Sequence, residues 1–236
     1  MHGFSVSKNL SHLTLESGRL AILAADHELT MGDIGLPCTE KLVAIARDSG
    51  IPALTLNAGR AAELSNFDGV HLVLQLMGGP TATEPRKHVT ATVEQALRLG
   101  ATAVSLQSSF LMSYDEAEVT KISQVAYEAR SFGLPTLLMI SGEQNQYRNL
   151  CDCVKFAKEV GVDMLKIPFV SSALGVVPKD RPLILMSGGE ADEQIDSRVR
   201  AALKEGYSGA CIGRSIFEAE SPIEAGKAVV NALQGA

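Results

Sequence analysis

The sequence predicts an α/β protein that folds as one (β/α)8, or TIM, barrel spanning residues 1–236. Three observations predict this fold. Short apolar runs alternate with helix-like segments along the whole chain. The runs are continuously hydrophobic, which is typical of parallel strands covered by helices. The unit repeats about eight times, and about 250 residues is the usual length of an eight-stranded barrel.

The apolar runs are the predicted strands. They lie at residues 20–26, 51–57, 71–77, 101–107, 134–141, 162–169, 181–189 and 208–214. Several intervening helical segments end in a glycine, which readily adopts the left-handed conformation that terminates a helix. These glycines are Gly50, Gly100, Gly133, Gly161 and Gly206. The least regular connection is residues 78–88, "GGPTATEPRKH", where no clear helix start follows the third strand.

A doubly wound open sheet is the alternative architecture. It receives little support, because no GxGxxG motif follows the first strand as dinucleotide binding would require. The chain also contains no Pro- or Ser-rich linker that would divide it. One barrel domain is therefore the better prediction.

Composition excludes several classes of partner. The formal net charge is -6, without a run of Lys or Arg, so we expect neither nucleic acid nor an anionic membrane as a partner. The N-terminus lacks a leader pattern, and no apolar run approaches the roughly 20 residues that cross a bilayer. We therefore expect a cytoplasmic protein. The four cysteines show no CxxC spacing, which indicates neither a disulfide scaffold nor a zinc site.

Catalytic groups of a barrel come from the C-terminal ends of its strands and the loops that follow. This rule gives a short set of candidates: Asp26-His27-Glu28, Ser141-Gly142-Glu143, Lys166, Ser187-Gly188-Gly189 and Gly213-Arg214. Three consecutive residues such as Asp26-His27-Glu28 do not converge on a metal ion, and no histidine cluster completes such a site. We therefore predict no metal and no cofactor.

Lys166 stands inside the apolar run "GVDMLKIPFV". If Leu165 and Ile167 face the helices, the strand period of two turns Met164, Lys166 and Pro168 toward the barrel interior. A partly desolvated interior favours the neutral amine, which attacks a carbonyl group to form a Schiff base. The residues alone support equally a lysine without a catalytic role, either a surface lysine on a loop or an inward lysine paired with Asp26 for structure alone.

Two glycine-containing motifs are candidates for anion binding. "LMSGG" ends the seventh strand at residues 185–189, and "CIGRS" ends the eighth at residues 211–215. Glycines let backbone N–H groups approach a phosphate, short helices after these strands would offer N-terminal dipoles, and Arg214 supplies a charged fork. Together the motifs predict a small phosphorylated substrate. We count His27 with the substrate-binding candidates.

Four motifs carry a resemblance to a known family. "ILAADHE", "DMLKIPF", "ILMSGGEA" and "GACIGRSIFEAE", in this order and at barrel spacing, resemble the archaeal-type class I fructose-bisphosphate aldolases. Relatives of that family include 2-amino-3,7-dideoxy-D-threo-hept-6-ulosonate synthase and the autoinducer-2 phosphate thiolase. The resemblance covers about residues 20–217. It implies that Lys166 is the Schiff-base lysine, that Asp26 is the acid beside it, and that the protein is a homo-oligomer. It further implies a phosphate site made of Ser187, Gly188, Gly189, Gly213 and Arg214.

One departure from the family concerns proton transfer. The aldolases place a tyrosine at the end of the fifth strand as the acid–base group, and this chain has Ser141 there. We expect protons to move through Asp26, Ser141, Glu143 or a bound water.

The expected activity is that of a class I aldolase or transaldolase-like lyase acting on a phosphorylated ketose or ketone. Two alternatives are acyl transfer from a phosphorylated diketone and a catalytically silent barrel that binds a phosphate metabolite.

Overall fold

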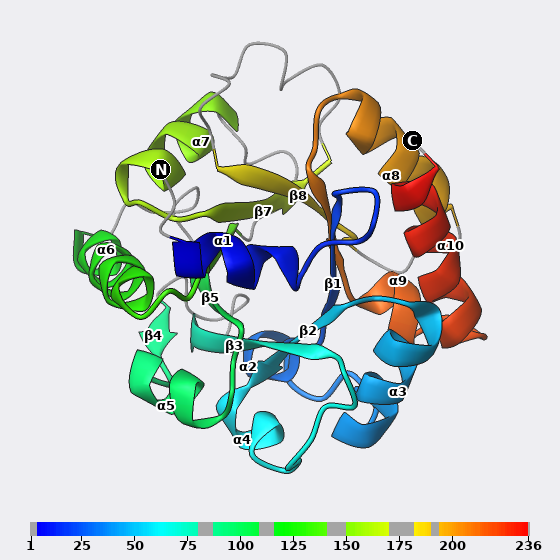
Figure 1. Cartoon of the computed structure of the whole chain (residues 1–236), viewed down its shortest axis with the longest axis horizontal. Helices are drawn as coiled ribbons and strands as arrows, with labels where there is room; N and C mark the ends of the chain where they lie inside the picture. The colour runs from blue at the N-terminus through cyan, green and yellow to red at the C-terminus, as the bar shows by residue number, and fades with distance from the viewer. Residues whose placement is uncertain are drawn as a thin grey trace.

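A computed structural model describes residues 4–79, 87–108, 116–140, 150–169, 182–189 and 194–235. Eight parallel strands pair in the order β2-β1-β9-β8-β7-β6-β5-β3, and pairing between β2 and β3 closes the barrel (Figure 1). Their bounds are β1 Leu20–Ala24, β2 Ala53–Asn57, β3 His71–Gly78, β5 Ala103–Ser108, β6 Thr136–Ile140, β7 Met164–Pro168, β8 Leu183–Ser187 and β9 Gly209–Ile212. The predicted (β/α)8 barrel is confirmed, and the open sheet is wrong.

The longer helices form a ring around the barrel (Figure 1). They are α3 Thr39–Ser49, α5 Val93–Arg98, α6 Glu116–Ser131, α7 Leu150–Glu159, α8 Ile195–Lys204 and α10 Pro222–Gln234. Each falls within a segment whose sequence predicts a helix. The five glycines predicted to end helices all have positive φ. The first turn of α5 is fixed by a capping box, in which Thr92 and Gln95 satisfy each other's backbone N–H groups.

Three one-turn helices and a short strand complete the described fold. The helices are α2 Glu28–Met31, α4 Ala58–Ala61 and α9 Arg214–Phe217, which follow β1, β2 and β9. The strand β4, His88–Val89, pairs antiparallel with the end of β3. It lies within the region after the third strand for which the sequence gives no clear helix start.

The strand residues divide between two hydrophobic clusters. Leu165 and Ile167 of β7 belong to the outer cluster, which lies between the strands and the helices. Met164 belongs to the inner cluster inside the barrel, together with residues such as Met139 and Cys211. The predicted alternation along this strand is confirmed.

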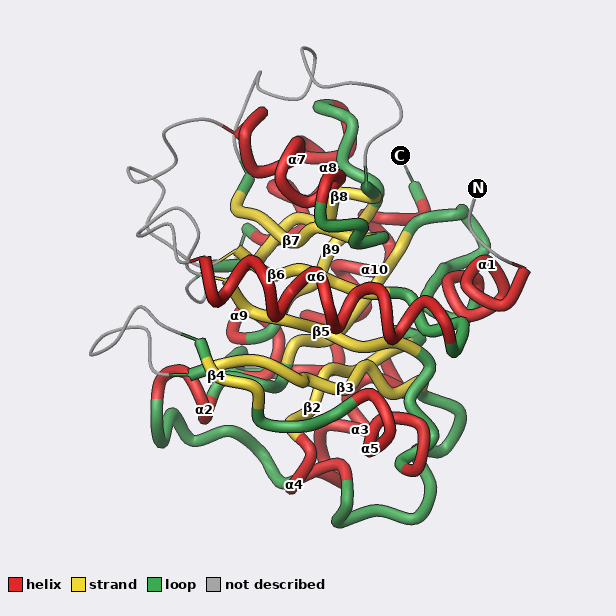
Figure 2. Tube along the Cα trace, turned by 90° about the vertical axis from the view of Figure 1, so that its left-hand side faces the viewer, coloured by secondary structure: helices red, strands yellow, loops and turns green. Residues whose placement is uncertain are grey.

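The helix α1, Phe4–Ser11, closes the N-terminal end of the barrel. Val6, Leu10 and Leu13 pack into the inner cluster, and the Asn9 side chain donates a hydrogen bond to the Gly133 carbonyl at 2.9 Å. Figure 2 shows α1 and α2 at opposite ends of the barrel. The candidate site therefore lies at the end opposite this apolar plug.

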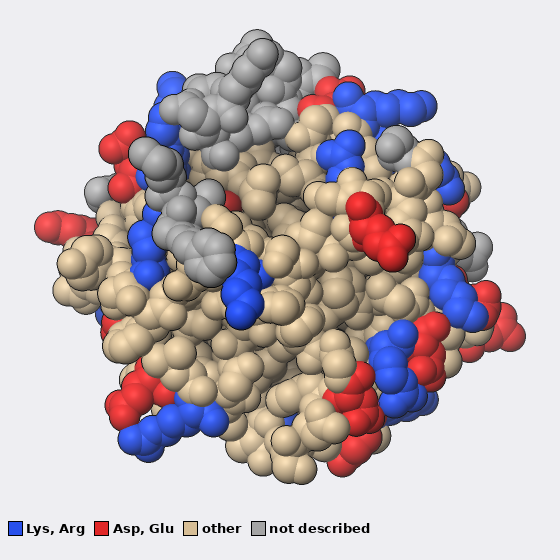
Figure 3. All heavy atoms as spheres, in the orientation of Figure 1, with Lys and Arg blue, Asp and Glu red and all other residues tan. Residues whose placement is uncertain are grey.

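The face that carries α1 has Lys and Arg side chains interspersed with Asp and Glu, mostly around its edge (Figure 3). On the described part of that face, the Lys and Arg side chains therefore do not gather into the basic patch that a nucleic-acid-binding surface would show. Within the described ranges, no helix has both the length and the apolar character needed to cross a membrane.

Candidate active site at the C-terminal end of the barrel

Lys166 lies at the centre of β7 and points into the barrel. Its Nζ atom lies 3.6 Å from the sulfur of Met139 on β6, and it also interacts with the Cys211 thiol on β9. Met139 and Cys211 are both buried in the inner cluster. The inward orientation predicted from the strand period is confirmed, and the surface-loop alternative is wrong.

The Asp26 carboxylate is 3% exposed and is held by two neutral donors. Thr55 donates to Oδ1 at 3.0 Å, and the Gln107 amide donates to Oδ2 at 3.1 Å. Burial raises the pKa of this carboxyl, but the charges of Lys166 and His27 and the hydrogen bonds outweigh burial, so the pKa falls below its ordinary value. Asp26 is therefore ionised at neutral pH.

Asp26 and Lys166 attract each other electrostatically, yet they form no direct ion pair. The Asp26 oxygens already accept bonds from Thr55 and Gln107. The alternative in which Lys166 is paired with Asp26 for structure alone is therefore not supported by the contacts. An amine near a carboxylate, but not bound to it, remains accessible for chemistry.

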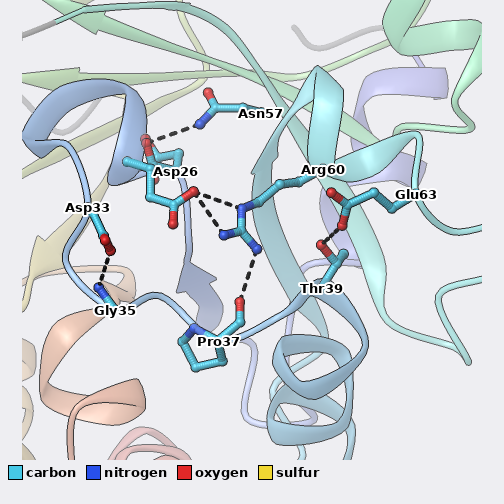
Figure 4. Close-up of polar contacts among 9 residues, drawn as sticks. Asp26, Asp33, Gly35, Pro37, Thr39, Asn57, Arg60 and Glu63 are labelled. Atoms are coloured by element: carbon cyan, nitrogen blue, oxygen red, sulfur yellow. Dashed lines mark hydrogen bonds and ion pairs between the residues drawn. The ribbon is translucent and has the colours of Figure 1, made fainter.

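The turn after β1 separates the three consecutive candidates. His27 is influenced by the charges of Asp26 and Lys166, whereas Glu28 turns away and accepts two bonds from Arg60 of α4, at 2.8 and 3.1 Å. Arg60 also donates to the Pro37 carbonyl, and Asn57 donates to the backbone carbonyl of Asp26 (Figure 4). Of the two residues that follow Asp26, only His27 therefore faces the site.

His27 is a neutral imidazole beside Lys166. Burial, with smaller effects from Lys166 and Arg214, lowers its pKa to about 4, and Asp26 only partly opposes the shift. Its ring meets that of Phe217 edge to face, with centroids 5.4 Å apart. Among the residues that the structure describes, its buried Nδ1 atom has no hydrogen-bond partner.

The predicted anion-binding residues gather at the ends of β8 and β9, which are neighbouring strands. A Cβ atom on Gly213 would lie 2.3 Å from His27 Cε1 and 2.4 Å from the Ala24 carbonyl oxygen. A Cβ atom on Gly188 would lie 2.9 Å from Ile212 Cγ2. Glycine at these two positions thus allows close packing of backbone and side chains. Arg214 follows directly, and its buried Nε has no hydrogen-bond partner within the described part of the chain.

The remaining candidates have different outcomes. Ser187 ends β8 and Gly189 lies just beyond it, with φ +73°. Ser141 and Glu143 lie outside the described residues, so the expected strand-five proton donor stays a prediction. Within the described ranges, no group of three or more potential metal-binding side chains occurs.

Two residues that hold Asp26 were missed by the sequence reasoning. Gln107 follows the strand-end rule, since it lies near the end of β5, and could have been found. Thr55 lies in the middle of β2 and carries no comparable signal. Pairing of β1 with β2 brings Thr55 to Asp26, and the assembled barrel brings Gln107 there from β5.

Comparisons with known proteins agree with this geometry. The chain is 26% identical over 230 residues to 2-amino-3,7-dideoxy-D-threo-hept-6-ulosonate synthase 1 of Archaeoglobus fulgidus, covering 94% of this chain and 88% of the relative. It is 29% identical over 220 residues to the synthase of Halobacterium salinarum, covering 86% and 82%.

A solved archaeal fructose-1,6-bisphosphate aldolase, whose catalytic lysine is bound to a carbinolamine intermediate, has the same fold. The TM-score is 0.83 at 23% identity, and the match covers 98% of this chain and 100% of that one. The family model described as DeoC/LacD family aldolase matches residues 20–219. The chain therefore belongs to the DeoC/LacD aldolase family.

Proposed function

We propose that this protein is a class I aldolase-type carbon–carbon lyase that forms a Schiff base between Lys166 and a phosphorylated ketose or ketone. The observation that carries the proposal is the inward Lys166 amine beside an ionised Asp26 that does not bind it directly. Family membership and the lysine-bound intermediate of the solved aldolase support the same chemistry.

The Lys166 amine attacks the substrate carbonyl carbon, and loss of water from the resulting carbinolamine leaves an iminium. The iminium accepts the electron pair of the carbon–carbon bond that breaks, giving an enamine. Asp26, as a carboxylate, accepts the proton of the hydroxyl group on the carbon that leaves as a carbonyl. Protonation of the enamine carbon gives a second iminium, and water hydrolyses it, which releases the carbonyl product and frees the Lys166 amine. Ser141 is the strand-five candidate for this protonation.

The phosphate of the substrate binds at the ends of β8 and β9 under this proposal. The phosphate approaches backbone N–H groups, and the side chains of Arg214 and His27 border it. The residues that supply this backbone are Ser187, Gly188, Gly189 and Gly213. The unpartnered Arg214 Nε and His27 Nδ1 support a role in ligand binding. Arg198 donates to the Gly188 carbonyl at 3.1 Å, which helps to hold the backbone of this turn in place.

Reductive trapping tests the Schiff base. The protein is treated with borohydride and, in turn, dihydroxyacetone phosphate, fructose 6-phosphate and fructose 1,6-bisphosphate, and its peptides are analysed by mass spectrometry. We expect an adduct on Lys166 with at least one compound, and none with Lys166→Met. The exposed Lys204→Met serves as the matched control and should retain the adduct. An adduct on another lysine, or on none, would contradict the proposal.

Product analysis separates the lyase from the two alternatives. Cleavage that requires coenzyme A and yields an acylated thiol would replace the lyase with an acyl transferase. Thermal stabilisation by these phosphates without any turnover would replace it with a binding protein.

We also propose that the protein acts in the cytoplasm as a homo-oligomer, without nucleic acid, membrane or cofactor as a partner. The net charge of -6 supports the exclusion of polyanionic partners. Light scattering coupled to size-exclusion chromatography tests the oligomer, and a mass of one chain would contradict it.

A further inference from the structure

Asp26 is held by contacts that the proposed reaction does not itself require. Thr55 on β2 donates to one carboxylate oxygen and Gln107 on β5 donates to the other, so the carboxylate plane is fixed from two strands. The Thr55 hydroxyl is itself fixed, because its oxygen accepts the Ala25 backbone N–H at 3.0 Å. Asp26 follows β1, and both donors are buried.

The orientation of the Gln107 amide follows from its two neighbours. An ionised carboxylate only accepts hydrogen bonds, so the NH2 group must face Asp26. The Gln107 carbonyl oxygen then accepts the Thr30 hydroxyl of α2 at 2.9 Å. Asp26 therefore sets the orientation of the amide, and Thr30 satisfies its remaining oxygen. Reversal of the amide would place two acceptors against each other at Asp26.

The same contacts tie the turn after β1 to the neighbouring strands. Thr30 reaches β5 through Gln107, and Leu29 lies close to Gly78 at the end of β3, where an added Cβ atom would be 3.1 Å from its Cδ2. Glu28 reaches α4 through Arg60. The turn that carries Asp26 is thus anchored on both sides.

We propose that Gln107 and Thr55 are positioning residues that keep the Asp26 carboxylate ionised and aimed toward Lys166. The proposal rests on the proposed function, and it assigns Asp26 the part of proton acceptor and counter-charge to the iminium, because two donated hydrogen bonds favour the charged form. It makes Asp26 a poor proton donor in the resting protein.

Other groups also act on the Asp26 charge. Lys166 on β7 favours the carboxylate, His27 in the same turn does so once its ring is protonated in acid, and Cys211 on β9 lies within electrostatic reach. The Glu28–Arg60 pair anchors the end of the same turn. Because these groups stay in place when Gln107 or Thr55 is changed, substitutions at the two donors isolate their contribution.

A direct titration tests the proposal without any substrate. The carboxyl carbon of Asp26 is followed by NMR against pH in protein labelled with ¹³C-aspartate and assigned with Asp26→Asn. Loss of one hydrogen bond to a charged group corresponds to about one pH unit. We therefore expect Gln107→Met and Thr55→Val each to move the Asp26 titration upward by about one pH unit, and Thr55→Ser to restore it.

Gln75→Met is the matched control. Gln75 is a buried glutamine of the neighbouring strand β3, and its partners are Ser105 and the Met77 carbonyl rather than Asp26. Its substitution should leave the Asp26 titration in place. An unchanged titration in folded Gln107→Met and Thr55→Val would overturn the proposal, as would an equal shift in Gln75→Met.

Kinetics then link the titration to the reaction. The rate of borohydride trapping with dihydroxyacetone phosphate is measured against pH. The pH at which this rate falls on the acid side should rise in Gln107→Met by the same amount as the NMR titration of Asp26. If the pH dependence of trapping stays unchanged while the NMR titration shifts, the Asp26 carboxylate does not act on the reaction at Lys166, and this part of the proposal is overturned. Absence of trapping with every compound would contradict the proposed function alone, since the titration does not depend on it.

Discussion

The two sides of Lys166 are built differently. On the side of β1, β2 and β5, Asp26, Thr55, Gln107 and Thr30 satisfy one another through a continuous set of hydrogen bonds. On the side of β8 and β9, glycines bring the backbone close, and His27 Nδ1 and Arg214 Nε are buried without partners.

The difference separates two tasks of an enzyme site. A group that moves a proton must be held in one orientation before the substrate arrives, and the first side does this with neutral donors. A buried polar atom without a partner is costly, and under the proposed function a bound phosphate would offset this cost on the second side.

Among these substitutions, Gly213→Ala, on the side of β8 and β9, should lower the stability of the protein most. The new Cβ atom would lie 2.4 Å from a backbone oxygen that cannot rotate away and 2.3 Å from the His27 ring. We expect a loss of roughly 3 kcal/mol in the free energy of unfolding, measured by urea denaturation. Gly59→Ala in α4 is the control, since a Cβ atom there meets nothing within 4 Å. Equal losses in both variants would contradict the close packing at Gly213.

The pH dependence of stability should report the buried His27. Its pKa is about 4 in the folded protein against an ordinary 6.5, so the unfolded chain binds the proton first as pH falls. This contribution is complete above pH 6.5 and is lost progressively down to about pH 4, by up to roughly 3 kcal/mol. His27→Gln should flatten the curve in that window, whereas exposed His88→Gln should not. A wild-type slope retained in His27→Gln would refute this assignment.

Arg214→Gln should weaken anion binding without disturbing the Asp26 side. A hydrogen bond between charged groups contributes about 1.5 to 3 kcal/mol, which corresponds to a roughly 10- to 100-fold rise in Kd. Calorimetric titration with inorganic phosphate measures it. The exposed Arg200→Gln in α8 is the control for the loss of one positive charge. A similar effect of both substitutions would point to overall charge rather than to a site.

The Glu28–Arg60 ion pair should contribute least to stability. Both side chains are partly exposed, at 36% and 19%, so water screens the attraction. A double-mutant cycle with Glu28→Gln and Arg60→Met should give a coupling free energy below about 1 kcal/mol in thermal unfolding. A larger coupling would mean that the turn carrying Asp26 depends on this pair for its position.

Much of the fold could be predicted because it depends on local patterns. Apolar runs, helical segments and terminal glycines occur in the right order, and the strand period places Lys166 on the face of its strand opposite to Leu165 and Ile167. The plug α1 was missed, since its Val6 and Leu10 become a core only when a closed barrel offers them a surface.

The candidate site could likewise be predicted only in part from the sequence. The residue types at Lys166, Asp26, Gly213 and Arg214 indicate imine and phosphate chemistry without a structure, since a lysine in an apolar strand and glycines at strand ends are unusual choices. The outcome at Ser141 stays a prediction. The sequence also leaves open whether Lys166 binds Asp26 directly.

The sequence by itself determined the order of strands and helices, the alternation of faces along β7 and the chemical class of the strand ends. These features follow from short-range periodicity and residue type. Only the tertiary structure decided that Lys166 points into the barrel, that Thr55 and Gln107 occupy the Asp26 oxygens, that Glu28 turns to Arg60 and that His27 packs on Gly213. Each of these arrangements joins residues of different elements, and their geometry exists only once the strands pair into the barrel.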